Sequence, residues 1–207
     1  MRLGDHLEKE FTKFSSNPDD LEELDLSNIG HINSLRRCDK EFIEKFEGIS
    51  SLCMIQVNLK SLKNWPKLNS VYLLNLNGNK LKTGLKEVVD NMPHISELEL
   101  EYNRFEDINE FHVLKGLTNL VSITLQGNPI TKLPSYRQEL FNLLPHVKMI
   151  DNYDSNEHDY MQDLIDRESD DIRINENMMK VADEVYREDL RNECCVLADM
   201  GDSIFCV

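Results

Sequence analysis

The sequence predicts an α/β solenoid, in which short repeats place their strands side by side in one curved, right-handed parallel sheet. Two observations predict this fold class. An apolar pattern with strand-like alternation recurs along the first 150 residues, and segments of short helical or irregular character separate its copies. A chain of 207 residues with 40% hydrophobic and 29% charged residues is long enough for one well-buried domain and an appended segment.

The copies are recognised by their spacing. Three of them carry the full L-x-x-L-x-L-x-x-N signature of a leucine-rich repeat. They are Val71, Leu74, Leu76 and Asn79; Ile95, Leu98, Leu100 and Asn103; and Leu120, Ile123, Leu125 and Asn128. Two weaker copies, which have an apolar residue where Asn would stand, begin at Leu21 and Ile49. Because five copies follow one another at spacings typical of the class, the sequence predicts five stacked repeats over residues 21–132.

The signature has a physical basis. Side chains alternate between the two faces of a strand, so the leucines of x-x-L-x-L-x point into the solenoid. The Asn is placed to bond backbone groups of the turn that would otherwise be buried without partners. A repeat buries its apolar face only by stacking on a neighbour, and both ends of the stack therefore need a cap.

Both caps are predicted. An N-terminal capping helix over residues 1–20 has Leu3, Leu7, Phe11 and Phe14 on one face. A C-terminal cap over residues 133–154 combines a helix with a strand-like segment from Val147 to Ile150. The inward residues of that helix are Tyr136, Leu140, Phe141 and Leu144. Residues 155–207 are expected to form an acidic tail that is partly helical or disordered.

The charge of the chain limits its partners. The net charge is −15, and from Asp151 onward there are seventeen acidic residues against five basic ones. A chain this acidic repels phosphate backbones and attracts basic partners. We therefore expect no direct nucleic-acid binding. No signal peptide and no apolar run of membrane-spanning length is present, and the five cysteines have no CxxC spacing. We expect a monomer without a membrane partner, in the nucleus and cytoplasm, with reduced thiols.

Enzymatic and metal-binding motifs are missing from the sequence. The segment after Gly78 has five residues before the next glycine and then Leu85, which does not fit a phosphate-binding loop. Neither a zinc-binding spacing nor an EF-hand loop occurs, and no nucleophile lies in an activating motif. The sequence therefore predicts no catalytic residue, no cofactor and no metal site.

Strand alternation also predicts a binding surface on the concave face, by which we mean the side of the sheet turned away from the core. The predicted partner-binding residues are Glu23, Asp25, Ser27, Ile55, Leu73, Asn75, Asn77, Glu97, Glu99, Glu101, Ser122, Thr124 and Gln126, with Ser51 and Cys53 on the same face. Acids on repeats one and four border a neutral, partly apolar middle. Stacked like charges repel each other, which favours a cationic partner. The alternative is that these acids only keep the sheet soluble and block edge pairing.

Three segments carry a family resemblance: NPDDLEELDLSN at 17–28, GLKEVVDNMPHISELELEYNRFEDI at 84–108 and YRQELFNLLPHVKMIDNYD at 136–154. Together they resemble the acidic leucine-rich nuclear phosphoprotein family. The resemblance implies a non-enzymatic protein that binds histones and other basic proteins, inhibits type 2A protein phosphatase and modulates histone acetylation and transcription. A more distant resemblance is to the spliceosomal A-prime leucine-rich protein. It implies the alternative function, a structural subunit of a ribonucleoprotein particle that clamps an RNA-binding partner.

Overall fold

Residues 21–159 of a computed structural model of the chain are described here. The chain divides into two units after His158, and the described residues belong almost wholly to the first. The capping helix expected within residues 1–20 and the tail beyond Asp159 lie outside the described residues.

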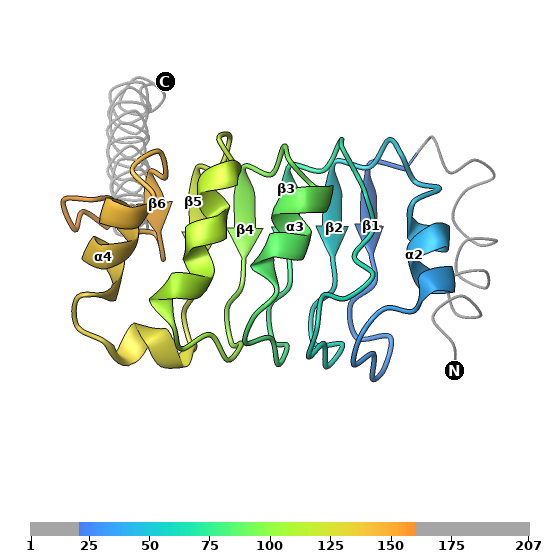
Figure 1. The fold of residues 1–207 in the computed structure, drawn as a ribbon, viewed down its shortest axis with the longest axis horizontal. Coiled ribbons are helices and arrows are strands. Elements are labelled where there is room, and N and C mark those ends of the chain that lie inside the picture. Colours follow the sequence, from blue (N-terminus) through green and yellow to red (C-terminus); the bar gives the residue numbers. More distant parts are fainter. Residues whose placement is uncertain (1–20, 160–207) are drawn as a thin grey trace, which may run out of the picture. The chain divides into compact units, whose positions relative to one another are not determined.

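Six parallel strands form one sheet in the order of the chain (Figure 1). They are β1 (Glu23–Asp25), β2 (Ser51–Cys53), β3 (Leu73–Asn75), β4 (Glu97–Glu99), β5 (Ser122–Thr124) and β6 (Met149–Ile150). Each strand is hydrogen-bonded to the next one along the chain, so each repeat adds one strand to the sheet. The predicted leucine-rich repeat solenoid is confirmed.

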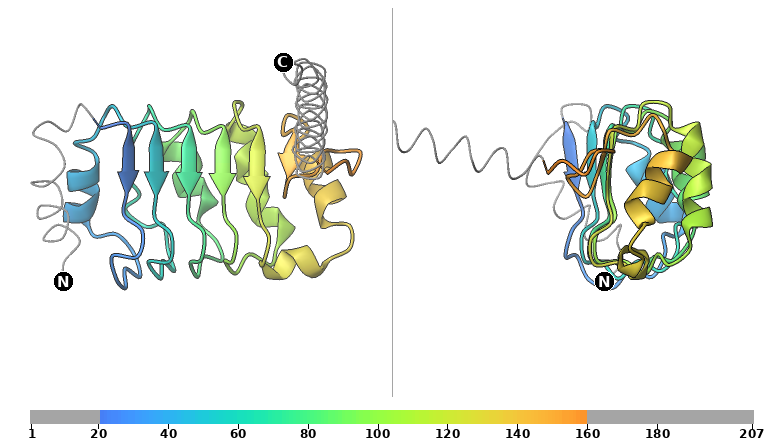
Figure 2. Two further views of the ribbon diagram at one scale, coloured as in Figure 1. Left: turned by 180° about the vertical axis from the view of Figure 1, so that it is seen from behind. Right: turned by 90° about the vertical axis from the view of Figure 1, so that its left-hand side faces the viewer.

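Helices and loops return the chain along the other side of the sheet (Figures 1 and 2). The helical elements are α2 (Arg37–Ile43), α3 (Leu85–Asn91), the 3-10 helices η2 (Ile108–Gly116) and η3 (Pro129–Lys132), and α4 (Tyr136–Leu143). Helix α2 was not expected from the sequence. It lies in the connection between the first two repeat starts, which are further apart than any other pair.

The core is a stack of the inward strand residues. Leu52, Leu74 and Leu98 lie in register on neighbouring strands, and each is at most 1% exposed. Aromatic side chains in the connections fill the far side of the core, and Trp65 is completely buried with its Nε1 donating to the Met92 sulfur at 3.3 Å. The lone tryptophan is therefore a packing residue.

A ladder of buried asparagines joins the repeats at the turns after the strands. Asn103 accepts the backbone N–H of Leu81 at 3.0 Å and donates to the carbonyl oxygens of Leu76 and Leu100 at 2.9 and 3.1 Å. Asn79 and Asn128 make the equivalent bonds one repeat earlier and later. The predicted role of the signature Asn is confirmed in the three repeats that contain it.

The same turns contain a residue in the left-handed region. In the fifth repeat this residue is Gly127, with φ of +76°, and a methyl group added to it would overlap the ring of Tyr102 from the preceding repeat. Gly78 has the same relation to Gln56. The side chain lying over each of these two turns leaves no room for a Cβ, whereas Asn28, Gln56 and Tyr102 adopt a positive φ at the equivalent position of the other repeats.

The C-terminal cap closes the stack with a buried carboxylate. Asp151 is 2% exposed and accepts hydrogen bonds from the backbone N–H groups of Leu125 and Gln126 and from the Tyr136 hydroxyl. The backbone of Ile150 pairs with that of Tyr153, which covers the last strand. The four cap residues predicted to face inward are all buried.

Candidate partner-binding face

The predicted concave-face residues form three rows that run across the strands. The register places Glu23, Ser51, Leu73, Glu97 and Ser122 in the first row, followed by Met149 of β6. It places Asp25, Cys53, Asn75, Glu99 and Thr124 in the second row. Backbone hydrogen bonds continue this ladder beyond the strands, which aligns Ser27, Ile55, Asn77, Glu101 and Gln126 in a third row. The sheet thus brings the predicted residues together on one surface, opposite the helices (Figure 2).

The acids divide between exposed and half-buried positions. Glu23, Asp25 and Glu97 are exposed, whereas Glu99 and Glu101 are half-buried. The apolar middle is also accessible, because Leu73 and Ile55 are half-buried. Among the fifteen residues of the three rows five are acidic and none is basic, so this surface presents only negative formal charge.

The neutral residues of the third repeat hold one of the glutamates in place. Asn75 and Asn77 both donate side-chain N–H groups to Oε2 of Glu99, the second at 2.9 Å. Asn77 also accepts the backbone N–H of Glu101 at 2.7 Å. Amide donors stabilise a carboxylate without cancelling its charge, so β4 retains its negative charge.

The pKa values of the two half-buried glutamates are raised from the ordinary 4.5. Burial is the main cause for Glu99, with Glu97 adding to it and the Asn77 and Asn75 amides opposing it. Burial is again the main cause for Glu101, with the nearby carboxylates of Asp151 and Glu99 adding to it. Burial and neighbouring carboxylates account for both shifts, and a positively charged ligand beside these carboxylates would lower their pKa values.

Cys53 differs from its neighbours because it is buried, although it lies on the outward side of β2. Its thiol lies 3.6 Å from Glu23 Oε1 and donates to it. Burial raises the pKa of the thiol to about 11; Ser51 lowers it, and the charges of Glu23 and Asp25 raise it further. The group is therefore a protonated, uncharged part of the surface rather than a reactive thiolate.

Ion pairs of the described residues lie away from this face. Examples are Lys86 with Asp90 in α3 at 2.7 Å and Lys82 with Glu106 at 3.8 Å. None of the five concave-face acids takes part in an ion pair within residues 21–159. The basic residues that form these pairs lie on the connections, and the concave acids have no counter-charge among residues 21–159.

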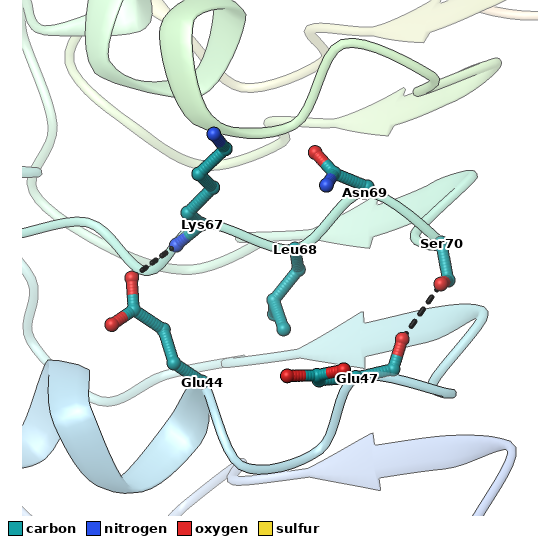
Figure 3. A pocket seen from close by; sticks show the side chains of 6 residues that line it. All are labelled: Glu44, Glu47, Lys67, Leu68, Asn69 and Ser70. Carbon is teal, nitrogen blue, oxygen red and sulfur yellow. Dashed lines mark hydrogen bonds between the residues drawn. The ribbon is translucent and has the colours of Figure 1, made fainter.

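A shallow hollow of about 520 Å³ lies between the connections that lead to β2 and β3 (Figure 3). The backbone N–H of Lys67 donates to Glu44 at 2.8 Å, and the Ser70 hydroxyl donates to the carbonyl of Glu47 at 2.6 Å. These polar groups already bond one another, and the hollow has no arrangement of nucleophile and base. Within residues 21–159 no cluster of potential metal ligands was found, and no helix there is long and apolar enough to cross a bilayer.

Sequence reasoning missed two contributors to the face. Asp151, which lies two strands further along the sheet, raises the pKa of Glu101, and Asn75 and Asn77 of the third repeat orient Glu99. A signal for the first existed, because the aspartate follows the last strand in the place where the face continues. The second could not be found, because the direction of an amide side chain depends on the neighbouring strand.

The fold and this surface define a leucine-rich repeat protein, and a family model described as "Leucine-rich repeat" matches residues 24–178. The chain belongs to this family. It is 40% identical over 124 residues to the acidic leucine-rich nuclear phosphoprotein 32-related protein of Plasmodium falciparum, covering 59% of this chain and 44% of that protein. It is 30% identical over 120 residues to acidic leucine-rich nuclear phosphoprotein 32 family member A of Drosophila melanogaster. That match covers 58% of this chain and 46% of the Drosophila protein.

The predicted resemblance to acidic leucine-rich nuclear phosphoproteins is confirmed by these two relatives. The chain spans less than half the length of each of them. Among solved structures, the chain is similar to one in the SNF/U2A′ complex of Drosophila melanogaster. That match has a TM-score of 0.56 and 23% identity and covers 64% of this chain and 73% of the other. At this identity the likeness concerns the fold.

Proposed function

We propose that this leucine-rich repeat interaction module binds basic segments of other proteins, such as histones, through its concave face. One observation carries the proposal: five carboxylates share the face, and none of them has a basic partner within residues 21–159. Burial and the neighbouring carboxylates raise the pKa of two of them, Glu99 and Glu101. A cationic side chain placed there relieves the repulsion and regains charge-assisted hydrogen bonds. The relatives' names, which describe acidic nuclear proteins, agree with a basic partner in the nucleus.

The proposal is non-enzymatic. Binding requires only the rows of side chains described above, and the protein acts by occupying a basic segment of its partner. The family resemblance adds two finer proposals, inhibition of type 2A protein phosphatase and modulation of histone acetylation and transcription, in the nucleus and the cytoplasm. A phosphatase assay tests the first of these. We expect phosphatase activity to fall as the concentration of the protein rises, and full phosphatase activity at a saturating concentration of the protein rejects the inhibition proposal.

Titration calorimetry of the full chain with a histone tests the main proposal. The variant Glu97→Gln/Glu99→Gln/Glu101→Gln keeps side-chain size and removes three negative charges from the concave face. We expect it to bind at least about tenfold more weakly, because several charged contacts are lost together. We also expect the wild-type affinity to fall steeply between 50 and 300 mM salt, since exposed charges are screened over about 8–10 Å at physiological salt.

The matched control removes the same charge elsewhere. Glu47→Gln/Glu87→Gln/Glu139→Gln changes three residues on the connections and helices, on the other side of the sheet. If net charge alone drives binding, both triple variants lose affinity equally, and the assignment to the concave face is rejected. Unchanged binding of histone by the first variant rejects it as well.

A second candidate function is a structural subunit of a ribonucleoprotein particle that clamps an RNA-binding protein. The half-buried Leu73 and Ile55 in the middle of the face favour it, because a protein partner can bury them. Such a complex depends on apolar burial and survives moderate salt. A stoichiometric RNA-binding protein that co-purifies with the chain at 300 mM salt would favour this function over the first.

A further inference from the structure

We propose that the occupant of the concave face is an extended segment that crosses the strands and carries basic side chains at positions i and i+4 with an apolar side chain at i+2. This inference rests on the proposed function, since it specifies which basic segments the face prefers. The register of the strands, the position of Leu73 and the backbone pairing of β2 to β6 each support it.

The register sets the spacing of the acids. Glu23 is aligned through Ser51 and Leu73 with Glu97, so the two exposed glutamates are three strands apart in one row. Asp25 and Glu99 are three strands apart in the next row. Neighbouring strands are about 4.8 Å apart, which places the β1 and β4 acids about 14 Å from each other. Two acidic sites at a fixed distance thus border the middle of the face.

An extended peptide matches this distance. It rises about 3.3 Å per residue, so positions i and i+4 are about 13 Å apart, and with i+2 they point to the same side. A helix rises 1.5 Å per residue and reaches about 14 Å after nine residues, where the side chain points to the opposite side. A straight helix therefore cannot place a cation over each acidic site at this separation as directly as an extended segment can.

The middle of the face suits an uncharged side chain. Leu73 of β3, in the first row, is half-buried, and the protonated Cys53 thiol lies diagonally beside it in the second row, while the half-buried Ile55 lies further along in the third row. No acid lies on the second repeat's part of the face. A basic side chain at i+2 would lose hydration there without an opposite charge, whereas an apolar one on the first row buries surface against Leu73.

Backbone pairing from β2 to β6 favours an occupant that lies across the face in this part of the sheet. Backbone groups of β2 to β5 bond the neighbouring strands on both sides, and the Ile150–Tyr153 pairing covers β6. An added strand has no free backbone row there. Recognition therefore depends on side chains, and their spacing becomes the basis of specificity.

Two peptides of equal composition test the inference. One has Lys, Leu and Lys at positions i, i+2 and i+4 in a Gly/Ser background, and the other has Lys, Lys and Leu at those positions. Fluorescence anisotropy with the full chain at 50 mM salt measures both affinities. The first peptide is expected to bind about fivefold more tightly. Its second lysine, at i+4, reaches an acid, whereas the second lysine of the other peptide, at i+2, does not, and one exposed ion pair changes affinity by about fivefold.

Variants of Glu23 and Glu97 in the first row distinguish the proposed spacing from charge attraction alone. Glu23→Gln and Glu97→Gln are each expected to reduce the preference for the first peptide to less than twofold, while Glu87→Gln in α3 leaves it at about fivefold. Equal binding of both peptides that is lost with Glu97→Gln overturns the spacing but retains the proposed function. Failure of both peptides to bind at millimolar concentration, where histone also fails, overturns the proposed function together with the inference.

Discussion

The substitution Asn103→Ala tests what joins one repeat to the next. The side chain is 4% exposed, accepts the Leu81 N–H and donates to the carbonyl oxygens of Leu76 and Leu100. Both carbonyl oxygens keep a second donor after the substitution, because Asn79 bonds Leu76 and Asn128 bonds Leu100. Only the Leu81 N–H is left buried without its partner.

The magnitude follows from that count. An unpaired buried N–H costs about 1–3 kcal/mol, and each weakened hydrogen bond to a carbonyl adds about 0.5–1.5 kcal/mol. With two such bonds to carbonyl oxygens, we expect the free energy of unfolding to fall by about 2–6 kcal/mol. Urea unfolding of the full chain, followed by far-ultraviolet circular dichroism, measures this difference, with the exposed Asn69→Ala as the control. A loss below about 0.5 kcal/mol, the range of ordinary surface substitutions, would refute the role given to the ladder.

A second variant separates the donor from the acceptor. Asn103→Asp keeps an oxygen for the Leu81 N–H but places a carboxylate against two carbonyl oxygens. Burial and repulsion raise the pKa of this carboxylate in the folded chain, so the variant's deficit relative to wild type is expected to shrink as the pH falls and the group gains a proton. An equal deficit at pH 7 and pH 4 would contradict this explanation.

Three further predictions concern the cap, the turns and the face. Tyr136→Phe removes a hydrogen bond to a buried carboxylate and should lower the free energy of unfolding by about 1–3 kcal/mol, measured by urea unfolding; a change below 0.5 kcal/mol would be contrary evidence. Gly127→Ala should lower the melting temperature more than Gly30→Ala, because both have positive φ but only Gly127 lies under the ring of Tyr102; equal losses would show that the overlap is relieved without cost. Glu101→Gln should stabilise the chain more at pH 7 than at pH 4. The raised pKa of Glu101 means that the wild-type chain loses folding stability as this carboxyl ionises above pH 4.5, and Gln cannot ionise. A difference in the free energy of unfolding that does not change with pH would argue against the raised pKa.

The repeat positions could be predicted because each is determined by its own repeat. Leu98, Leu100 and Asn103 occur at fixed offsets, alternation turns the leucines inward, and a buried turn requires the amide. The strands and the ladder of buried asparagines could therefore be located from the amino-acid sequence alone. The orientation of Glu97 and its counterparts followed from the same alternation.

Other features depend on contacts between repeats, and the sequence does not contain these directly. Helix α2 forms in a connection without a repeat pattern, and Asp39 at its N-terminal end bonds the side chain and backbone of Arg36. The Cys53 thiol donates to the Glu23 side chain of the preceding strand, a contact between two repeats. Asp151 reads as an ordinary turn residue, and its burial under Tyr136 appears only when the cap folds back.

The most direct test of the central claim is a map of where a basic segment binds. Backbone amide NMR signals of the full chain, titrated with the Lys-x-Leu-x-Lys peptide, report this residue by residue. The proposed function predicts the largest shift changes at residues 23–27 and 97–101, with α3 and η2 unaffected. Shift changes concentrated on α3, or beyond residue 159 alone, would contradict the concave face as the binding surface.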